Sequence, residues 1–117
     1  MSDKKQINGV SYNDSAVDLG HSVIFMGEDG IIEIDCSDNK EYDIEEIKQN
    51  LECIKKFAAG KKVLVVSNSK QYSTVTKEAR HYIASGPHKD FILAEAFVIH
   101  TLGQVILGNL CLGVNNP

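Results

Sequence analysis

Residues 63–80, VLVVSNSKQYSTVTKEAR, decide the fold, because an apolar strand runs there into a hydroxyl-rich loop and then into an amphipathic helix. Residues 63–66 are apolar at every position, which is typical of a strand buried inside a parallel sheet. In an open α/β sheet, ligands bind and modifications act beyond the carboxyl ends of the strands. The helix start after this loop also presents free backbone N–H groups and a positive dipole end. We therefore look for functional residues in the loop of residues 67–76.

Two β-rich runs precede this stretch. Residues 17–26 and 31–36 flank Gly27-Glu28-Asp29-Gly30, a loop with glycine at both ends, and this pattern predicts a hairpin. In the second run Ile32 and Ile34 alternate with charged residues, so one face of that strand should be buried. Residues 1–16 are polar, and we expect a frayed start or one short edge strand there.

Three helices are expected. Asp43-Ile44-Glu45-Glu46 is a capping box that opens a helix with an apolar stripe, closed by Gly60. The second helix should begin near Ser73, Thr74 or Thr76 and end at Ser85-Gly86-Pro87. Residues 91–99 form a further long β run, and a capping box at residues 101–104 starts a short third helix.

The resulting order is β-β-α-β-α-β-α, a mixed β-sheet of the α/β class in one domain, residues 17–117. Because parallel strands are joined by right-handed crossovers, the helices should lie on one face of the sheet. Glu33, Asp35 and Glu95 are the charges that would keep the other face wet. We expect these apolar residues in the core: Ile32, Ile34, Ile47, Leu51, Ile54, Val63, Val65, Ala79, Ile83, Leu93, Phe97, Val105 and Ile106.

Several short motifs accompany this order. They are Asp29-Gly30-Ile31, Glu78-Ala79-Arg80 with Tyr82 and Ala84-Ser85, the run of residues 94–98, and Leu107-Gly108-Asn109-Leu110 before a final Asn-Pro. Over roughly residues 20–117 the sequence resembles the small bacterial STAS-like proteins, relatives of the anti-sigma-factor antagonists, and within them an uncharacterised single-domain subgroup. The resemblance implies a STAS-like sheet with helices packed on one face. Members of the subgroup continue beyond this Asn-Pro, so we expect a shortened or naturally short member.

The resemblance also implies a regulatory site. Antagonists of this family carry a phosphorylated serine at the start of the middle helix, within an Asp-Ser-Ser/Ala-Gly pattern, whereas this chain reads Ser73-Thr74-Val75-Thr76 without the Asp-Ser pair or the glycine. The candidate phosphoacceptor or anion site is formed by Ser73, Thr74, Thr76, Lys77 and Arg80. The alternative is that the three hydroxyls only cap the helix and that Arg80 makes a surface ion pair with Glu28 or Glu95.

Composition bounds the remaining function classes. The 117-residue chain is 43 % hydrophobic and 24 % charged, with a net charge of −4, so we expect a globular protein that binds neither nucleic acid nor membrane. Three cysteines without paired spacing favour the cytoplasm over a secreted disulfide framework. The histidines have no metal-ligand spacing, and no cofactor loop or nucleophile motif is present, so we expect no metal, no cofactor and no catalytic residue.

The sequence therefore favours a non-enzymatic regulatory domain that binds an unidentified protein partner and is switched in the loop of residues 67–76. The alternative is a small-molecule module for an anion, a nucleotide or a lipid, since STAS-like folds resemble the lipid-carrying CRAL-TRIO fold; an enzyme of unknown reaction is the third reading. A one-sided helix layer leaves apolar surface uncovered, so we also expect a homodimer.

Overall fold

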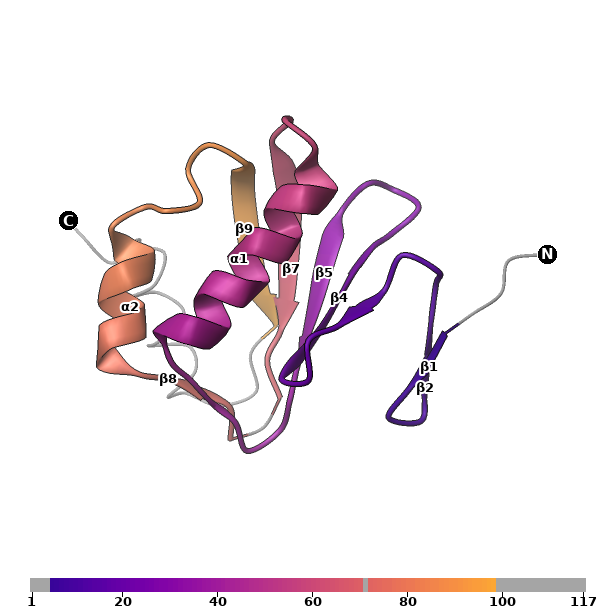
Figure 1. Ribbon diagram of the computed structural model, residues 1–117, viewed down its shortest axis with the longest axis horizontal. Helices are drawn as coiled ribbons and strands as arrows, with labels where there is room; N and C mark the ends of the chain where they lie inside the picture. Colours follow the sequence, from indigo (N-terminus) through magenta and orange to yellow (C-terminus); the bar gives the residue numbers. More distant parts are fainter. Residues whose placement is uncertain (1–4, 71, 99–117) are drawn as a thin grey trace.

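A five-stranded mixed sheet is the centre of the fold in the computed structural model, which describes residues 5–70 and 72–98 (Figure 1). The strand order is β3-β4-β5-β7-β9, with the first three strands antiparallel and β5, β7 and β9 parallel. The strands are β3 (Val17–Asp18), β4 (Ser22–Met26), β5 (Ile32–Cys36), β7 (Val63–Asn68) and β9 (Ile92–Val98). The expected α/β class with a mixed sheet is confirmed.

The N-terminal region is more regular than the sequence suggests. β1 (Lys5–Ile7) and β2 (Val10–Tyr12) form a hairpin whose turn residues Asn8 and Gly9 both have positive φ, the backbone that a two-residue primed turn requires. Tyr12 and Ala16 pack with Val23 of β4 in a small second core. The hairpin therefore covers part of the sheet face that faces away from the helices.

The run of residues 17–26 is two strands rather than the single strand predicted. Gly20 has φ 89° and its N–H donates to the Asp18 carboxylate, while the Leu19 N–H donates to the carbonyl of Ser22. These bonds turn the chain back on itself, so β3 pairs antiparallel with β4. The predicted hairpin between β4 and β5 is confirmed, with Ile32 and Ile34 buried.

Helix α1 (Ile44–Ala58) begins at the predicted capping box. The Asp43 carboxylate accepts from the N–H of Ile44 at 2.8 Å, and the Glu46 carboxylate accepts from the N–H of Asp43 at 2.8 Å. At the other end Ala59, with φ 51°, takes the left-handed position before Gly60. The helix end is therefore one residue earlier than a glycine cap alone predicts.

Two further short strands have no clear signal in the sequence. β6 (Glu41–Tyr42) precedes α1, β8 (Thr74–Val75) precedes α2 (Lys77–Ala84), and the two strands pair in parallel. Of the three starting residues considered for the second helix, Thr76 is the N-cap. The predicted third helix lies outside the described residues, as do Val105 and Ile106 of the predicted core.

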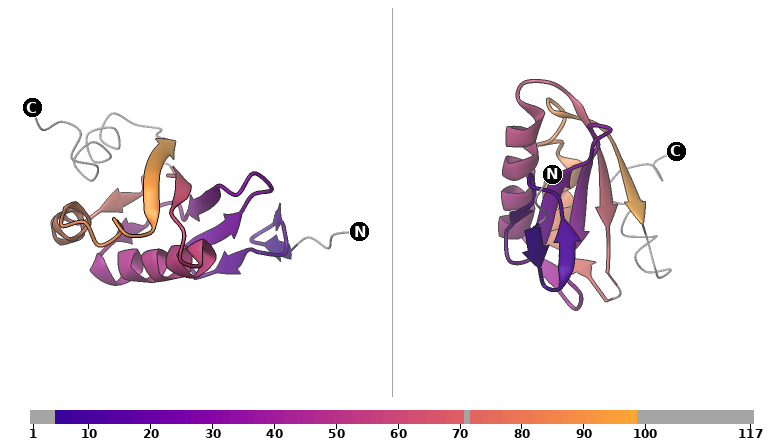
Figure 2. Two further views of the ribbon diagram at one scale, coloured as in Figure 1. Left: turned by 90° about the horizontal axis from the view of Figure 1, so that it is seen from above. Right: turned by 90° about the vertical axis from the view of Figure 1, so that its right-hand side faces the viewer.

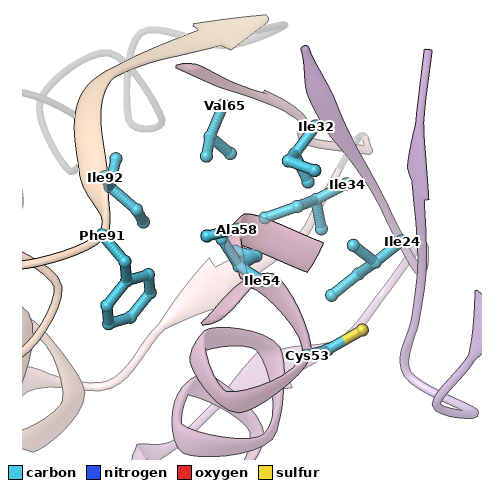
Figure 3. Close-up of a cluster of buried hydrophobic side chains, with 9 residues drawn as sticks. All are labelled: Ile24, Ile32, Ile34, Cys53, Ile54, Ala58, Val65, Phe91 and Ile92. Carbon is cyan, nitrogen blue, oxygen red and sulfur yellow. The ribbon is translucent and has the colours of Figure 1, made fainter. Parts of the chain in front are cut away.

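Helix α1 lies across one face of the sheet, and α2 packs beside α1 (Figure 2). Figure 3 shows Ile54 and Ala58 of α1 meeting the strand residues Ile32, Ile34 and Val65 in the main core. Ile32, Ile34, Ile54, Val65 and Ala79 are buried as predicted, while Ile47, Leu51, Val63, Ile83 and Phe97 are half-buried.

Leu93 is the predicted core residue that the structure contradicts, because it is 65 % exposed. β7 and β9 pair Val63 with Ile92 but Leu64 with Ala94, so Leu93 is an extra residue in the ladder. Such a bulge changes which side chains face the core. Leu64 is also 43 % exposed and Val98 44 % exposed, so an apolar stretch of sheet at β7 and β9 faces away from α1.

Candidate functional site

The loops that follow β5 and β7 lie side by side at the carboxyl ends of these parallel strands. The Thr74 N–H donates to the carbonyl of Lys40 at 2.9 Å, and the Ser73 hydroxyl donates to the carbonyl of Ser37 at 2.5 Å. The pairing of β6 with β8 continues this contact as far as the starts of both helices. The loop singled out from the sequence is thus attached to the loop after β5.

The three hydroxyls of the candidate phosphoacceptor site occupy different environments. Ser73 is buried. Thr76 caps α2, because its Oγ1 accepts from the N–H of Ala79 at 3.1 Å. Thr74 is the most exposed of the three, while Thr76 is half-buried.

The two basic residues of that site do not converge on one point. Lys77 is the first residue of α2 and is exposed. Arg80 turns back along the helix, and its Nη1 donates to the carbonyl of Val75 at 2.8 Å. Glu95, one of the two expected ion-pair partners of Arg80, instead accepts from Ser67. The guanidinium therefore supports the chain entering α2.

A carboxylate lies at the start of α2. The Thr76 hydroxyl donates to Oδ1 of Asp43 at 2.9 Å. The pKa of Asp43 is lowered by the hydrogen bond from the Ile44 N–H and then by that from Thr76, so this group is ionised at neutral pH. A negative charge next to the positive dipole end is favourable. An anion bound at the same helix start would be repelled by Asp43.

A cavity of about 110 Å³ lies beneath these loops, between the two helices and the sheet. Ser67, Ser69, Ser73 and Thr74 contribute to its lining, so the hydroxyl-rich loop faces the cavity from the sheet side. The other polar residues that line it were not expected at a site from the sequence: Cys36, Tyr42, Asn50, His88 and Glu95. No local motif marks them, since they come from separate elements.

Glu95 corrects the sequence interpretation most clearly. It was expected on the wet face of the sheet with Glu33 and Asp35, but it lines the cavity on the helix side. Its Oε2 accepts from the Ser67 hydroxyl at 2.8 Å, and burial raises its pKa. The bulge at Leu93 shifts the alternation of β9 and so places Glu95 inside.

Tyr42 lines the cavity and is hydrogen-bonded to the loop after β5. Its hydroxyl accepts from the Ser37 N–H at 2.9 Å and from the Ser22 hydroxyl at 3.3 Å, and donates to the carbonyl of His21. The ring is 3 % exposed, and burial raises the pKa of the phenol to about 12. The phenol therefore stays protonated and ties β4 to the β5 loop.

The thiols in the described part of the chain are not activated. Burial raises the pKa of Cys36 to about 11 and also raises that of Cys53, whereas a reactive cysteine needs a lowered pKa. Burial lowers the pKa of His88, and Lys89 lowers it further.

Across residues 5–70 and 72–98, no group of three His, Cys, Asp or Glu side chains is placed to hold a metal ion. Neither helix of that part is long and apolar enough to cross a membrane.

A family model described as a domain of unknown function (DUF7793) matches residues 25–117. The chain belongs to this family. No curated protein matches the chain, and neither does any solved structure.

The matched region contains the whole cavity and both loops. All residues that line the cavity lie between Ile34 and Phe97, inside the family match. The hairpin of β1 and β2, strand β3 and the first residues of β4 precede it. The candidate site is therefore built by the family domain itself, and the N-terminal hairpin is an addition to the far side of the sheet.

Proposed function

We propose that this protein is a STAS-like, non-enzymatic regulatory domain that acts in the cytoplasm by binding a protein partner, and that a charge added at Thr74 switches it. The order β4-β5-α1-β7-α2-β9 supports the STAS-like assignment, because it follows the order expected from the sequence. The small sheet of β6 and β8 is an insertion into this order at the carboxyl ends of β5 and β7.

The observation that carries the proposal is the position of Thr74 opposite Glu41. The two residues are direct partners in the parallel ladder of β6 and β8, and both are exposed. Phosphorylation would add about −1.5 to −2 charges to Thr74. Like charges directly opposite each other destabilise a strand pair. A phosphate on Thr74 would therefore weaken the pairing that holds the two loops together.

Tyr72 is the residue through which we expect the loop to contact its partner. Its side chain is 63 % exposed, and its φ of 68° lies in the left-handed region that a bulky residue rarely adopts. Backbone strain of this kind is concentrated at functional sites. Tyrosine is also among the side chains that contribute most to protein interfaces. Opening the β6 and β8 pair would move Tyr72, since it lies two residues before Thr74.

Two measurements test the switch. Phosphopeptide mapping of the protein from its native cells is expected to find phosphate on Thr74 and not on the buried Ser73. In vitro, Thr74→Glu should reduce the hydrogen-exchange protection of the backbone amides of residues 74 and 76. The expected loss is about fivefold, which corresponds to about 1 kcal/mol, the upper range for a cross-strand pair. Glu41→Gln should restore that protection in the double variant.

The matched control is Ser11→Glu, an exposed strand hydroxyl in β2. It adds the same charge on the N-terminal hairpin, outside the pair of β6 and β8, and should leave both amides protected. Unchanged protection in Thr74→Glu, or no recovery with Glu41→Gln, would refute the charge switch. The partner itself is tested by Tyr72→Ala, which should abolish capture of a protein that wild type and the Ser11 variant both retain.

A second candidate function, a small-molecule binding module, is favoured by the cavity between the helices and the sheet. An anion or a nucleotide at the start of α2 is less favoured, because the Asp43 carboxylate already accepts the Thr76 hydroxyl there.

A further inference from the structure

The cavity between α1, α2 and the sheet has a size and lining that select a ligand chemistry. Its volume of about 110 Å³ is well below the roughly 300–1,000 Å³ of pockets that take drug-sized ligands. Seven apolar side chains contribute to the lining: Ile34, Ile47, Leu51, Ile54, Val75, Ile83 and Phe97. An occupant must therefore be short, with an apolar body.

Asn50 supplies an unpartnered acceptor to this cavity. The residue lies on the inner side of α1 and is 7 % exposed. Its side-chain oxygen Oδ1 is buried without a hydrogen-bond partner in the part of the chain that the structure describes. Buried polar groups in native proteins are nearly always hydrogen-bonded, so an orphan acceptor needs an explanation.

Glu95 supplies a second acceptor, a carboxyl group. It enters the cavity from β9 and holds one hydrogen bond, from the Ser67 hydroxyl at 2.8 Å. Among residues 5–70 and 72–98, no ion pair joins it to a cationic side chain, and desolvation raises the pKa of this carboxyl. A carboxylate in such a place is stabilised by a cation that brings its own hydrogen-bond donors.

The geometry points to a binding site for a short aliphatic amine, held as its ammonium ion by Glu95 and by Oδ1 of Asn50. An ammonium group has three donors and no acceptor. It can therefore donate to both the Glu95 carboxylate and Oδ1 of Asn50. The alkyl chain lies against the isoleucines, Leu51 and Phe97. Glu95 repels a carboxylate ligand of the same shape, and an alcohol offers one donor to two acceptors.

The test is a titration of the ¹⁵N-labelled protein with n-butylamine at neutral pH, followed by two-dimensional NMR. We expect saturable shifts at Ile34, Ile54 and Ser67, which line the cavity. Butyrate and 1-butanol, which match the alkyl body, should give no saturable shift. Glu95→Gln should weaken butylamine binding by about tenfold or more, since hydrogen bonds to charged groups are the stronger class.

Two further variants keep the proposal falsifiable. Asn50→Leu removes the amide acceptor without adding charge and should also weaken binding, even where Glu95→Gln fails to fold. Glu33→Gln is the matched control. It makes the same chemical change on β5, where Glu33 lies between the inward residues Ile32 and Ile34 and so faces away from the cavity. This variant should bind butylamine like wild type. The proposal is overturned if butylamine causes no saturable shift, if butyrate or butanol binds equally well, or if both cavity variants bind like wild type.

Discussion

The hydroxyl of Thr76 donates to the carboxylate of Asp43 at 2.9 Å, so the N-caps of the two helices are hydrogen-bonded to each other. Each residue also caps its own helix, since Asp43 accepts from the Ile44 N–H and Thr76 from the Ala79 N–H. One bond thus couples α1 to α2 at the end of the molecule where the loops after β5 and β7 meet.

Thr76→Ala should lower the free energy of unfolding by about 1–2 kcal/mol, because it removes the cap of α2 and the bond to Asp43. Urea unfolding followed by circular dichroism measures this loss. The neighbouring Thr74→Ala, at an exposed position, is the control and should change stability by less than about 0.5 kcal/mol. Equal losses in both variants would mean that the cap contributes nothing specific.

Glu95→Gln should make stability less dependent on pH. Burial raises the pKa of Glu95 above its ordinary 4.5, so the folded protein binds this proton more tightly than the unfolded chain. Stability from this group is therefore full below pH 4.5 and declines as the pH rises through the raised pKa. The variant should lack this decline and be more stable at pH 7 by about 1 kcal/mol. Thermal unfolding from pH 4 to 8 checks it, and a variant with the slope of wild type would contradict the prediction.

Tyr42→Phe should cost about 1–3 kcal/mol, because the amide of Ser37 and the hydroxyl of Ser22 lose the oxygen that they contact. Tyr72→Phe removes the same atom from a side chain that is 63 % exposed and should be near neutral. Chemical denaturation of the two variants side by side distinguishes them. A neutral Tyr42→Phe would show that the hydroxyl is not needed to hold the β5 loop.

Cys36 should react slowly with alkylating reagents. Its pKa of about 11 against an ordinary 9.0 leaves roughly a hundredfold less thiolate at pH 8 than in a free cysteine. Timed iodoacetamide labelling with peptide mass spectrometry measures the rate, and the same protein in urea provides the reference. Labelling at equal rates in both conditions would refute the assigned environment.

The homodimer expected from the sequence stays a prediction. The exposed Leu64 and Leu93 on the face away from α1 are the apolar surface that we expect a second copy to cover. Sedimentation equilibrium should give twice the 12.9 kDa chain mass, and Leu93→Lys should shift the protein toward monomer. A monomer at high micromolar concentration would end this expectation.

Features that depend on neighbouring residues were predictable from the sequence alone. The capping box at Asp43, the glycine-bounded hairpin between β4 and β5, and the inward alternation of Ile32 and Ile34 were all expected and are confirmed. Each rests on interactions within a few residues of the chain, such as a carboxylate that reaches an amide of its own first turn. The loop expected over residues 67–76 does follow β7, but β7 continues to Asn68 and residues 74–75 form β8, so the loop is shorter than expected.

Tertiary structure alone decided how the site is arranged. The bulge at Leu93 turns Glu95 toward the helices, the β5 loop pairs with residues before α2, and Asn50 meets the cavity from α1. These outcomes join residues that are tens of positions apart. A shift of one residue in strand pairing exchanges the two faces of the strand. No local pattern in residues 91–99 predicts that the bulge falls at Leu93. The sequence by itself therefore determined α1, α2, the hairpin between β4 and β5 and the position of the functional loop after β7. Long-range strand pairing decided which polar side chains that loop encloses.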